Sequence, residues 1–243
     1  MWKLIGLLLL SFHSLAAGTL RIATDASYPP FEYIDQAGQF QGLDIDIANA
    51  LCRQMKVECA FLHKSFDSLL PGLQFNNYDA VIAALNPTPE RRQQVAFSEL
   101  YYESGAVFIA KAGRYSSYHN LSDQSIGVQN GSVQLRYLLD KPKMESALVV
   151  PYHSYSMAFS DLVNGNIDLV LVDDAVAKVW LGKSENKGFT IVGDTLIDPQ
   201  YFGDGYAIAV NKRNSKLLNQ LNQALQQIKL SGEYQRIISS YFN

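Results

Sequence analysis

The first third of the chain changes between two hydrophobic periods, which predicts strands and helices in turn. Residues 19–24 alternate apolar and polar positions as a half-buried strand does, whereas Ile47, Leu51 and Met55 recur on one face of a helix. Residues 78–85 are almost continuously apolar, as in a strand buried on both faces of a parallel sheet. The predicted strands cover residues 19–24, 57–61 and 78–85, and the predicted helices cover residues 44–56 and 66–75. This order predicts an open α/β sheet.

The rest of the chain repeats this pattern of strands and helices without any repeat of the sequence itself. Strands are predicted at residues 106–111, 125–128, 148–152, 167–172 and 206–210, and helices at residues 133–139, 155–164, 175–181, 215–231 and 233–242. Two α/β lobes with a ligand between them would accommodate this order. The chain would cross between the lobes near residues 102–105 and 201–205, and both segments contain glycine, as hinges that permit lobe closure often do.

A polar segment, residues 86–98 (NPTPERRQQVAFS), follows the most apolar predicted strand. Thr88 can cap a short helix, and Pro89 fits the first helical position, where no N–H is needed. Arg91 would then lie at the positive end of that helix, where a cation is unfavourable. Its guanidinium, beside free helix N–H groups, can bind both oxygens of a small carboxylate. The alternative is a surface arginine paired with a neighbouring acid.

Composition narrows the class of protein. The 243 residues are 48% hydrophobic and 18% charged, with a net charge of −3, which is ordinary for a globular protein. The mild acidity argues against nucleic-acid binding, which would call for a basic face. The four histidines are scattered, so we expect no metal site and no cofactor.

The N-terminus has the pattern of a secretory signal. Lys3 precedes an apolar run at residues 4–10, and small residues at 14–17 offer a cleavage site. We therefore expect residues 1–17 to be a signal peptide and the mature protein to be periplasmic, with a buried N-terminal helix as the alternative. In that oxidising compartment Cys52 and Cys59 can form a disulfide, whereas two buried free thiols are the alternative.

Eight segments with characteristic motifs extend over nearly the whole chain. They are ATDASYPPFEY, GLDIDIANALC, FDSLLPGL, YDAVIAALNPTPER, VAFSELYY, IGVQNGS, NGNIDLVLVD and YFGDGYAIAV. In this order and spacing they resemble the periplasmic polar amino-acid binding proteins of ABC importers, and most nearly the arginine-binding (lysine/arginine/ornithine type) members. The resemblance implies a type II clamshell of two α/β lobes, each a central sheet flanked by helices, joined by two hinge strands. Residues 18–103 and 204–243 would form lobe 1, and residues 104–203 lobe 2.

The resemblance also implies how the α-carboxylate and α-ammonium groups of an amino acid would be bound. Arg91 would hold the carboxylate, and Ser132 with the N–H groups of its turn would complete that site. Asp173 would take the ammonium group. The alternative role for Asp173 is the N-cap of the following helix, although we expect Asp174 to be that cap.

The run from Ala83 to Asn86 departs from the family pattern, which has small or hydroxyl residues there. A serine hydroxyl contact is lost. The carbonyl of Ala84 can still accept the α-ammonium group, and Asn86 can donate to the carboxylate.

Other residues would select the ligand side chain. Asp25 could pair with a cationic side chain, and Tyr28 and Phe66 could sandwich a flat guanidinium. Gln134 could contact its distal nitrogens. The alternatives are a turn aspartate, a core phenylalanine and an exposed glutamine, and we expect Glu32 to lie on the surface.

These features imply a monomeric solute receptor that binds a basic L-amino acid, most readily arginine, and passes it to an inner-membrane ABC permease. Lysine, ornithine and histidine are alternative ligands. An exported dehydratase of the prephenate or arogenate type is the alternative function. Such an enzyme needs a general acid or base, and the ligand loops contain no histidine; His63 and His153 are the nearest in sequence. We therefore expect no enzymatic activity.

Overall fold

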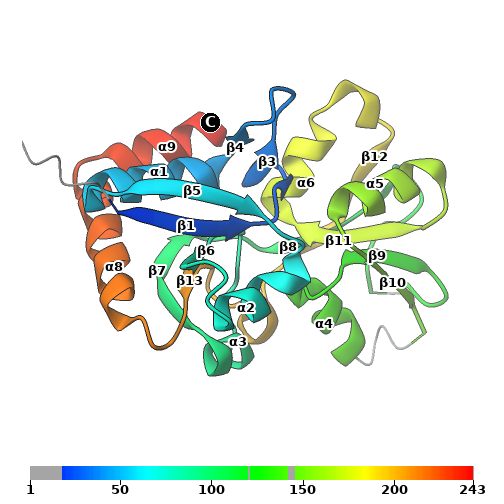
Figure 1. Ribbon diagram of the computed structural model, residues 1–243. Coiled ribbons are helices and arrows are strands. Elements are labelled where there is room, and N and C mark those ends of the chain that lie inside the picture. Colours follow the sequence, from blue (N-terminus) through cyan, green and yellow to red (C-terminus); the bar gives the residue numbers. More distant parts are fainter. Residues whose placement is uncertain (1–17, 120, 142–145, 243) are drawn as a thin grey trace, which may run out of the picture.

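The computed structural model describes residues 18–119, 121–141 and 146–242. The chain forms two lobes, each built on a five-stranded sheet with helices on its faces (Figure 1). The expected two-lobed α/β fold is therefore confirmed. The expected signal peptide, residues 1–17, lies outside the described residues. In the part of the chain that is described, no helix has the length and apolar character needed to cross a membrane.

The first lobe combines the N-terminal strands with a strand from near the C-terminus. Its sheet has the order β5-β1-β6-β13-β7, in which β1 is parallel to β5 and β6, and β13 is antiparallel to its neighbours. The strands are β1 (Thr19–Thr24), β5 (Glu58–His63), β6 (Ala80–Val81), β7 (Ala96–Tyr102) and β13 (Tyr206–Val210). The helices are α1 (Leu43–Met55), α2 (Phe66–Gln74), α3 (Pro89–Gln94), α8 (Ser215–Leu230) and α9 (Glu233–Tyr241).

Alternation along the strands divides the core of this lobe into two layers. Ile22 belongs to the cluster that contains the buried faces of α1 and α8, including Ile47 and Leu221. Its neighbour Ala23 faces the other side and packs with Leu69 and Leu73 of α2. Successive strand residues point to opposite faces, so helices cover the sheet on both sides (Figure 1).

A small three-stranded sheet leads from β1 to α1. Its strands are β2 (Ser27–Tyr28), β3 (Glu32–Ile34) and β4 (Phe40–Gln41), in the order β2-β3-β4. This sheet was not predicted from the sequence, and it brings Tyr28 and Glu32 into the interior, with 7% and 1% of their surfaces exposed.

The second lobe has a sheet of order β10-β9-β11-β8-β12. Its strands are β8 (Ala106–Lys111), β9 (Ser125–Gln129), β10 (Leu148–Tyr152), β11 (Leu169–Asp173) and β12 (Phe189–Leu196). Its helices are α4 (Val133–Asp140), α5 (Tyr155–Asn164), α6 (Asp174–Leu181), the 3-10 turn η2 (Ser184–Asn186) and the short α7 (Pro199–Phe202). Residues of α4 pack on one face of the sheet, and residues of α5 and α6 pack on the other.

The two connections between the sheets lie side by side. One joins β7 to β8, and the other joins α7 to β13. Gly205 has a φ of +142°, and a Cβ atom there would lie 2.2 Å from the carbonyl oxygen of Tyr102. Only glycine therefore lets the second connection approach the first this closely. The side-chain nitrogen of Asn86 also donates to the carbonyl of Phe202 at 2.5 Å, which ties this connection to the first lobe.

Three elements differ from the sequence-based predictions. The apolar run 78–85 contributes only Ala80–Val81 to the sheet, because the chain turns at Ala84, which has a φ of +44°. Strands β7 and β12 were not predicted. The expected turn at residues 201–205 begins instead with the end of helix α7.

Cys52 and Cys59 form a disulfide between the end of α1 and β5. The bond closes a loop with a sequence separation of 7 residues. Replacing both cysteines with alanine should lower the free energy of unfolding by about 2–3 kcal/mol, because the unfolded chain regains that loop's entropy. Urea denaturation of both proteins would measure the difference, and the native protein should weigh two hydrogen atoms less than its reduced form. An unchanged mass on reduction would contradict the bond.

Candidate functional site

A small cavity lies between the lobes, where strands of both sheets end. It encloses about 250 Å³ between the atoms that line it, open solvent included. The lining residues are Tyr28, Phe66, Ala83, Ala84, Asn86, Arg91, Gln129, Ser132, Val133, Gln134, Tyr155 and Asp173. Every residue predicted for ligand binding lines this cavity except Asp25, which is hydrogen-bonded to the lining residue Gln129. The structure therefore brings the predicted residues together.

Arg91 is buried and joins the two lobes. The hydroxyl of Thr88 accepts a hydrogen bond from the Arg91 backbone N–H at 3.2 Å, which is the N-cap that the sequence predicted. The guanidinium donates to the carbonyl of Asn86 at 3.0 Å and, across the cleft, to the carbonyl of Gly131 at 3.1 Å. Burial lowers the pKa of Arg91 to about 10, and the charge of Asp173 opposes this shift. Arg91 is therefore still a cation at neutral pH.

Asp173 reaches the cavity from the second lobe. It occupies the N-cap position of α6, yet its carboxylate makes no capping hydrogen bond. Instead it accepts from the hydroxyl of Tyr28 at 2.6 Å and from the side-chain amide of Gln134 at 2.7 Å. Burial raises the pKa of Asp173 to about 6, while hydrogen bonding from Tyr28 and the charge of Arg91 act in the opposite direction.

The expectation that Asp174 caps α6 was wrong. Its carboxylate accepts from the hydroxyl of Ser104 at 2.8 Å and from Lys178, four residues along the helix, at 2.9 Å. These partners engage the side chain of Asp174 and leave that of Asp173 directed into the cleft.

Asp25 lies at the end of β1 with 3% of its surface exposed. Its carboxylate accepts from the hydroxyl of Ser27 at 2.9 Å and from the amide of Gln129, in the other lobe, at 2.7 Å. Burial raises the pKa of Asp25. His63 lies 3.9 Å from this carboxylate, but its Nδ1 accepts the backbone N–H of Ala26 and therefore carries no proton that could make an ion pair.

Ala84 and Asn86, which precede Arg91 in the chain, also line the cavity. Ala84 donates its N–H to Oδ2 of Asp44 at 2.8 Å. The side-chain nitrogen of Asn86 donates to the hinge carbonyls of Phe202 and Gly205, so donation to a ligand carboxylate would require it to leave those partners.

Ser132 caps helix α4, and its hydroxyl accepts the N–H of Leu135 at 3.1 Å. This places the first N–H groups of α4 at the cavity, next to the guanidinium of Arg91. The ring of Phe66 lies under that same guanidinium, with 5.5 Å from its carbon to the ring centroid. Phe66 thus contacts the protein's own cation as well as the cavity.

Sequence reasoning missed four residues that line the cavity, Ala83, Gln129, Val133 and Tyr155, and it misplaced Glu32, which lies outside the lining. Gln129 ends strand β9, and only the fold brings its amide to Asp25 across the cleft. Tyr155 begins α5, and its ring stacks on Tyr28 with centroids 5.1 Å apart. Glu32 was expected on the surface, but its side chain is buried, and the strand that carries it, β3, contacts α1.

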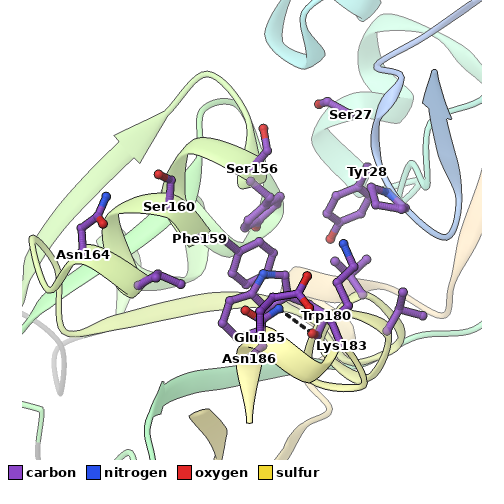
Figure 2. A pocket seen from close by; sticks show the side chains of 15 residues that line it. Ser27, Tyr28, Ser156, Phe159, Ser160, Asn164, Trp180, Lys183, Glu185 and Asn186 are labelled. Carbon is purple, nitrogen blue, oxygen red and sulfur yellow. Dashed lines mark hydrogen bonds between the residues drawn. The ribbon is translucent and has the colours of Figure 1, made fainter. Parts of the chain in front are cut away.

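A larger cavity, which encloses about 1000 Å³ by the same measure, lies beside this one (Figure 2). Its walls come from β2, α5, α6 and the segment around Lys183, and Figure 2 shows Phe159 and Trp180 stacked along one side. The Tyr28 and Tyr155 rings line both cavities. The buried charges converge on the smaller cavity, which we therefore treat as the functional site.

The smaller cavity presents one cation, Arg91, and one carboxylate, Asp173, to a bound molecule. A second buried carboxylate, Asp25, lies behind Gln129, to which it is hydrogen-bonded. Within the described ranges, no group of three or more His, Cys, Asp or Glu side chains is arranged to hold a metal ion. The arrangement is that of a binding site for a small charged molecule.

Comparison with known proteins agrees with this geometry. A family model described as bacterial extracellular solute-binding proteins, family 3, matches residues 20–243. The chain is 44% identical over 233 residues to the ABC transporter arginine-binding protein 1 of Escherichia coli strain K12, covering 96% of this chain and 94% of that protein.

Solved structures give the same result. A Salmonella typhimurium periplasmic binding protein described as having high arginine specificity is similar with a TM-score of 0.89 and 41% identity, covering 93% of this chain and 100% of that chain. An ancestral amino acid-binding protein, described as a precursor of cyclohexadienyl dehydratase, has a TM-score of 0.83 and 29% identity, covering 93% and 96% of the two chains. The resemblance recognised in the sequence is thus confirmed, and this chain belongs to the bacterial extracellular solute-binding proteins of family 3.

Proposed function

We propose that this protein binds a basic L-amino acid, L-arginine first among them, in the cavity between its lobes and delivers it to the membrane permease of an ABC importer. One observation carries the proposal. Buried groups of opposite charge, Arg91 from the first lobe and Asp173 from the second, line the same small cavity. An amino acid zwitterion presents the complementary pair of charges.

The number and sign of the charges at the site are complementary to those of a basic amino acid. Such a ligand carries two cations and one anion. The cavity and the adjoining Asp25 together carry two anions, Asp25 and Asp173, and one cation, Arg91. The α-carboxylate would contact Arg91 and the helix start at Ser132, and the α-ammonium group would contact Asp173 and the carbonyl of Ala84. Asp25 then remains for the side-chain cation.

The part of the cavity that would receive the ligand's side chain favours a guanidinium group. The rings of Tyr28 and Phe66 line the cavity and can stack on a flat cation, which contributes about 2 kcal/mol or more when the contact is desolvated. The amides of Gln129 and Gln134 lie at the same cavity. The close relatives named as arginine-binding proteins support this choice. Lysine, ornithine and histidine are the competing ligands.

The chain is a binding protein and not an enzyme, in agreement with its relatives, which are binding components of transporters. The ancestral precursor of a dehydratase is a more distant neighbour, at 29% identity. The carboxyl groups of the cavity are all accounted for by binding an amino acid.

We also propose the arrangement of the chain in the cell. Relatives of this family are periplasmic, and residues 1–17 would be the signal peptide that directs this chain there. Lobe 1 would comprise residues 18–103 and 204–243, and lobe 2 would comprise residues 104–203. This division agrees with the membership of the two sheets. The protein would act as a monomer, closing around its ligand before it docks on the permease.

Isothermal titration should show L-arginine binding with a dissociation constant in the micromolar range or below. Arg91→Ala should abolish the binding of every amino acid, since all share the carboxylate. Arg92→Ala is the matched control, because Arg92 lies over Phe97 and away from the cavity. No heat with any basic amino acid would refute the proposed ligand class.

Asp25→Asn should weaken the binding of arginine and lysine by about 10- to 100-fold, because a charged hydrogen-bond partner contributes about 1.5–3 kcal/mol. Any residual binding of glutamine, which is neutral, should change little. Comparing the two losses by titration tests the assignment of Asp25 to the side-chain cation. Equal losses for neutral and cationic ligands would show that Asp25 supports the fold instead.

Binding should also weaken in acid. The α-ammonium group requires ionised Asp173, whose pKa is raised to about 6 in the free protein. Affinity for L-arginine should therefore be constant above that pH and fall as the pH drops through it, up to about tenfold per pH unit. In Asp173→Asn the affinity should be low throughout, and this inflection should be missing. An unchanged inflection in that variant would assign the titration to another group.

A further inference from the structure

Two buried carboxyl groups lie behind the wall of the cavity and take no part in the charges described above. They are Glu32 of β3 and Asp44 of α1, whose residues expose 1% and 0% of their surfaces. Oε2 of Glu32 and Oδ1 of Asp44 are buried, and each lacks a hydrogen-bond partner when both groups are treated as carboxylates. The two side chains are nevertheless within hydrogen-bonding reach of each other. A proton on one of the two groups would give it a hydrogen bond to donate to the other.

The other carboxylate oxygen of Asp44, Oδ2, fixes the backbone at the wall of the binding site. Oδ2 accepts the backbone N–H of Ala84 at 2.8 Å and the hydroxyl of Tyr101 at 2.8 Å. Ala84 has a φ of +44°, in the left-handed region that residues with a Cβ rarely adopt. The surroundings must therefore hold it there, and the hydrogen bond to Asp44 does so. Ala84 lines the cavity, and its carbonyl is the proposed acceptor for the α-ammonium group.

The charges around this pair require one of the two carboxyls to keep its proton. Among the hydrogen bonds and ion pairs of the described residues, neither group has a Lys, Arg or His partner. The ionisable groups that act on them are Tyr101, Asp25 and Asp173, which are neutral or negative. Burial and the neighbouring Asp44 raise the pKa of Glu32 well above its usual value. Two adjacent carboxyls without a cation do not both ionise.

We propose that Glu32 and Asp44 share one proton and form a positioning pair that holds the Ala84 carbonyl toward the ligand's α-ammonium group. Protonated Glu32 donates to Asp44. With this donor, the hydroxyl of Tyr101 and the N–H of Ala84, the carboxylate of Asp44 has three donors, and these oppose the burial that raises its pKa to about 7. An ionised Asp44 is the stronger acceptor for the Ala84 N–H. The positioning role rests on the proposed amino-acid function, whereas the shared proton does not.

Infrared spectroscopy of the ligand-free protein tests the shared proton. At neutral pH the wild type should show the C=O stretch of a buried protonated carboxylic acid, shifted in heavy water, and Glu32→Gln should lack it. Asp46→Asn, two residues along α1 from Asp44, is the control and should keep the band. A wild-type protein without the band would overturn the proposal, whatever the protein binds.

Titration with two ligands tests the positioning role. Glu32→Gln keeps an N–H donor to Asp44 and should bind L-arginine within about twofold of the wild type. Glu32→Met has a similar shape and no donor, and should bind L-arginine about tenfold or more weakly. With desamino-arginine, which lacks the α-amino group, the wild type and Glu32→Met should bind equally well.

The outcomes separate the two proposals. Equal losses for both ligands in Glu32→Met would mean that the pair acts on the fold as a whole, which overturns the positioning role. A melting temperature of Glu32→Gln close to that of the wild type would confirm that the amide replaces the acid without disturbing the core. If the wild type binds no amino acid at all, the proposed function and the positioning role both fail, and the infrared band alone decides the shared proton.

Discussion

The buried guanidinium of Arg91 is the constraint on which the rest of the site depends. A cation removed from water needs hydrogen-bond acceptors and a counter-charge, and here the backbone supplies the acceptors from both lobes. The carbonyls of Asn86 and Gly131 each accept one N–H from the guanidinium. The bond to Gly131 therefore joins the two lobes on one side of the cavity and closes it there. The same closure brings Asp173, the counter-charge, to the other side of the cavity.

The local sequence around each anchor frees its side chain for the cavity. Thr88 and Pro89 satisfy the start of α3, so Arg91 can turn inward despite its position in the first turn. At α6 the carboxylate of Asp173 gives up the capping hydrogen bond that an aspartate at that position usually makes. It binds Tyr28 and Gln134 instead. A helix cap contributes about 1 kcal/mol, and its omission at the end of β11 indicates that the binding site determined the choice of residue.

The sequence predicted the parts of the fold that depend on local signals. Regular periodicity located most helices and strands, and the cap pattern located Arg91. Strand β7 was missed because Ser98 interrupts its apolar pattern: the Ser98 hydroxyl replaces a ladder carbonyl and accepts the N–H of Ile208 at 2.9 Å. The contact between Gln129 and Asp25 joins residues 104 positions apart. The burial of Glu32 likewise depends on a tertiary contact with α1. Neither leaves a periodic signal, so only the folded chain reveals them.

In the free protein the buried carboxylates of the site are only partly compensated, so a ligand that brings cations beside them gains binding energy. The pKa of Asp173 is about 6 instead of its ordinary 3.8, which corresponds to about 3 kcal/mol of unfavourable ionisation in the folded protein at neutral pH. The cause is desolvation, which hydrogen-bond donors and Arg91 only partly offset. A ligand ammonium group placed beside Asp173 removes this penalty, and a second cation beside Asp25 does the same there, because burial also raises the pKa of that carboxyl. A molecule with a single cation relieves only one of the two carboxylates. In the proposed binding mode, the burial of Asp25 would therefore favour basic over neutral amino acids, because only a ligand with two separated cations would compensate both carboxylates.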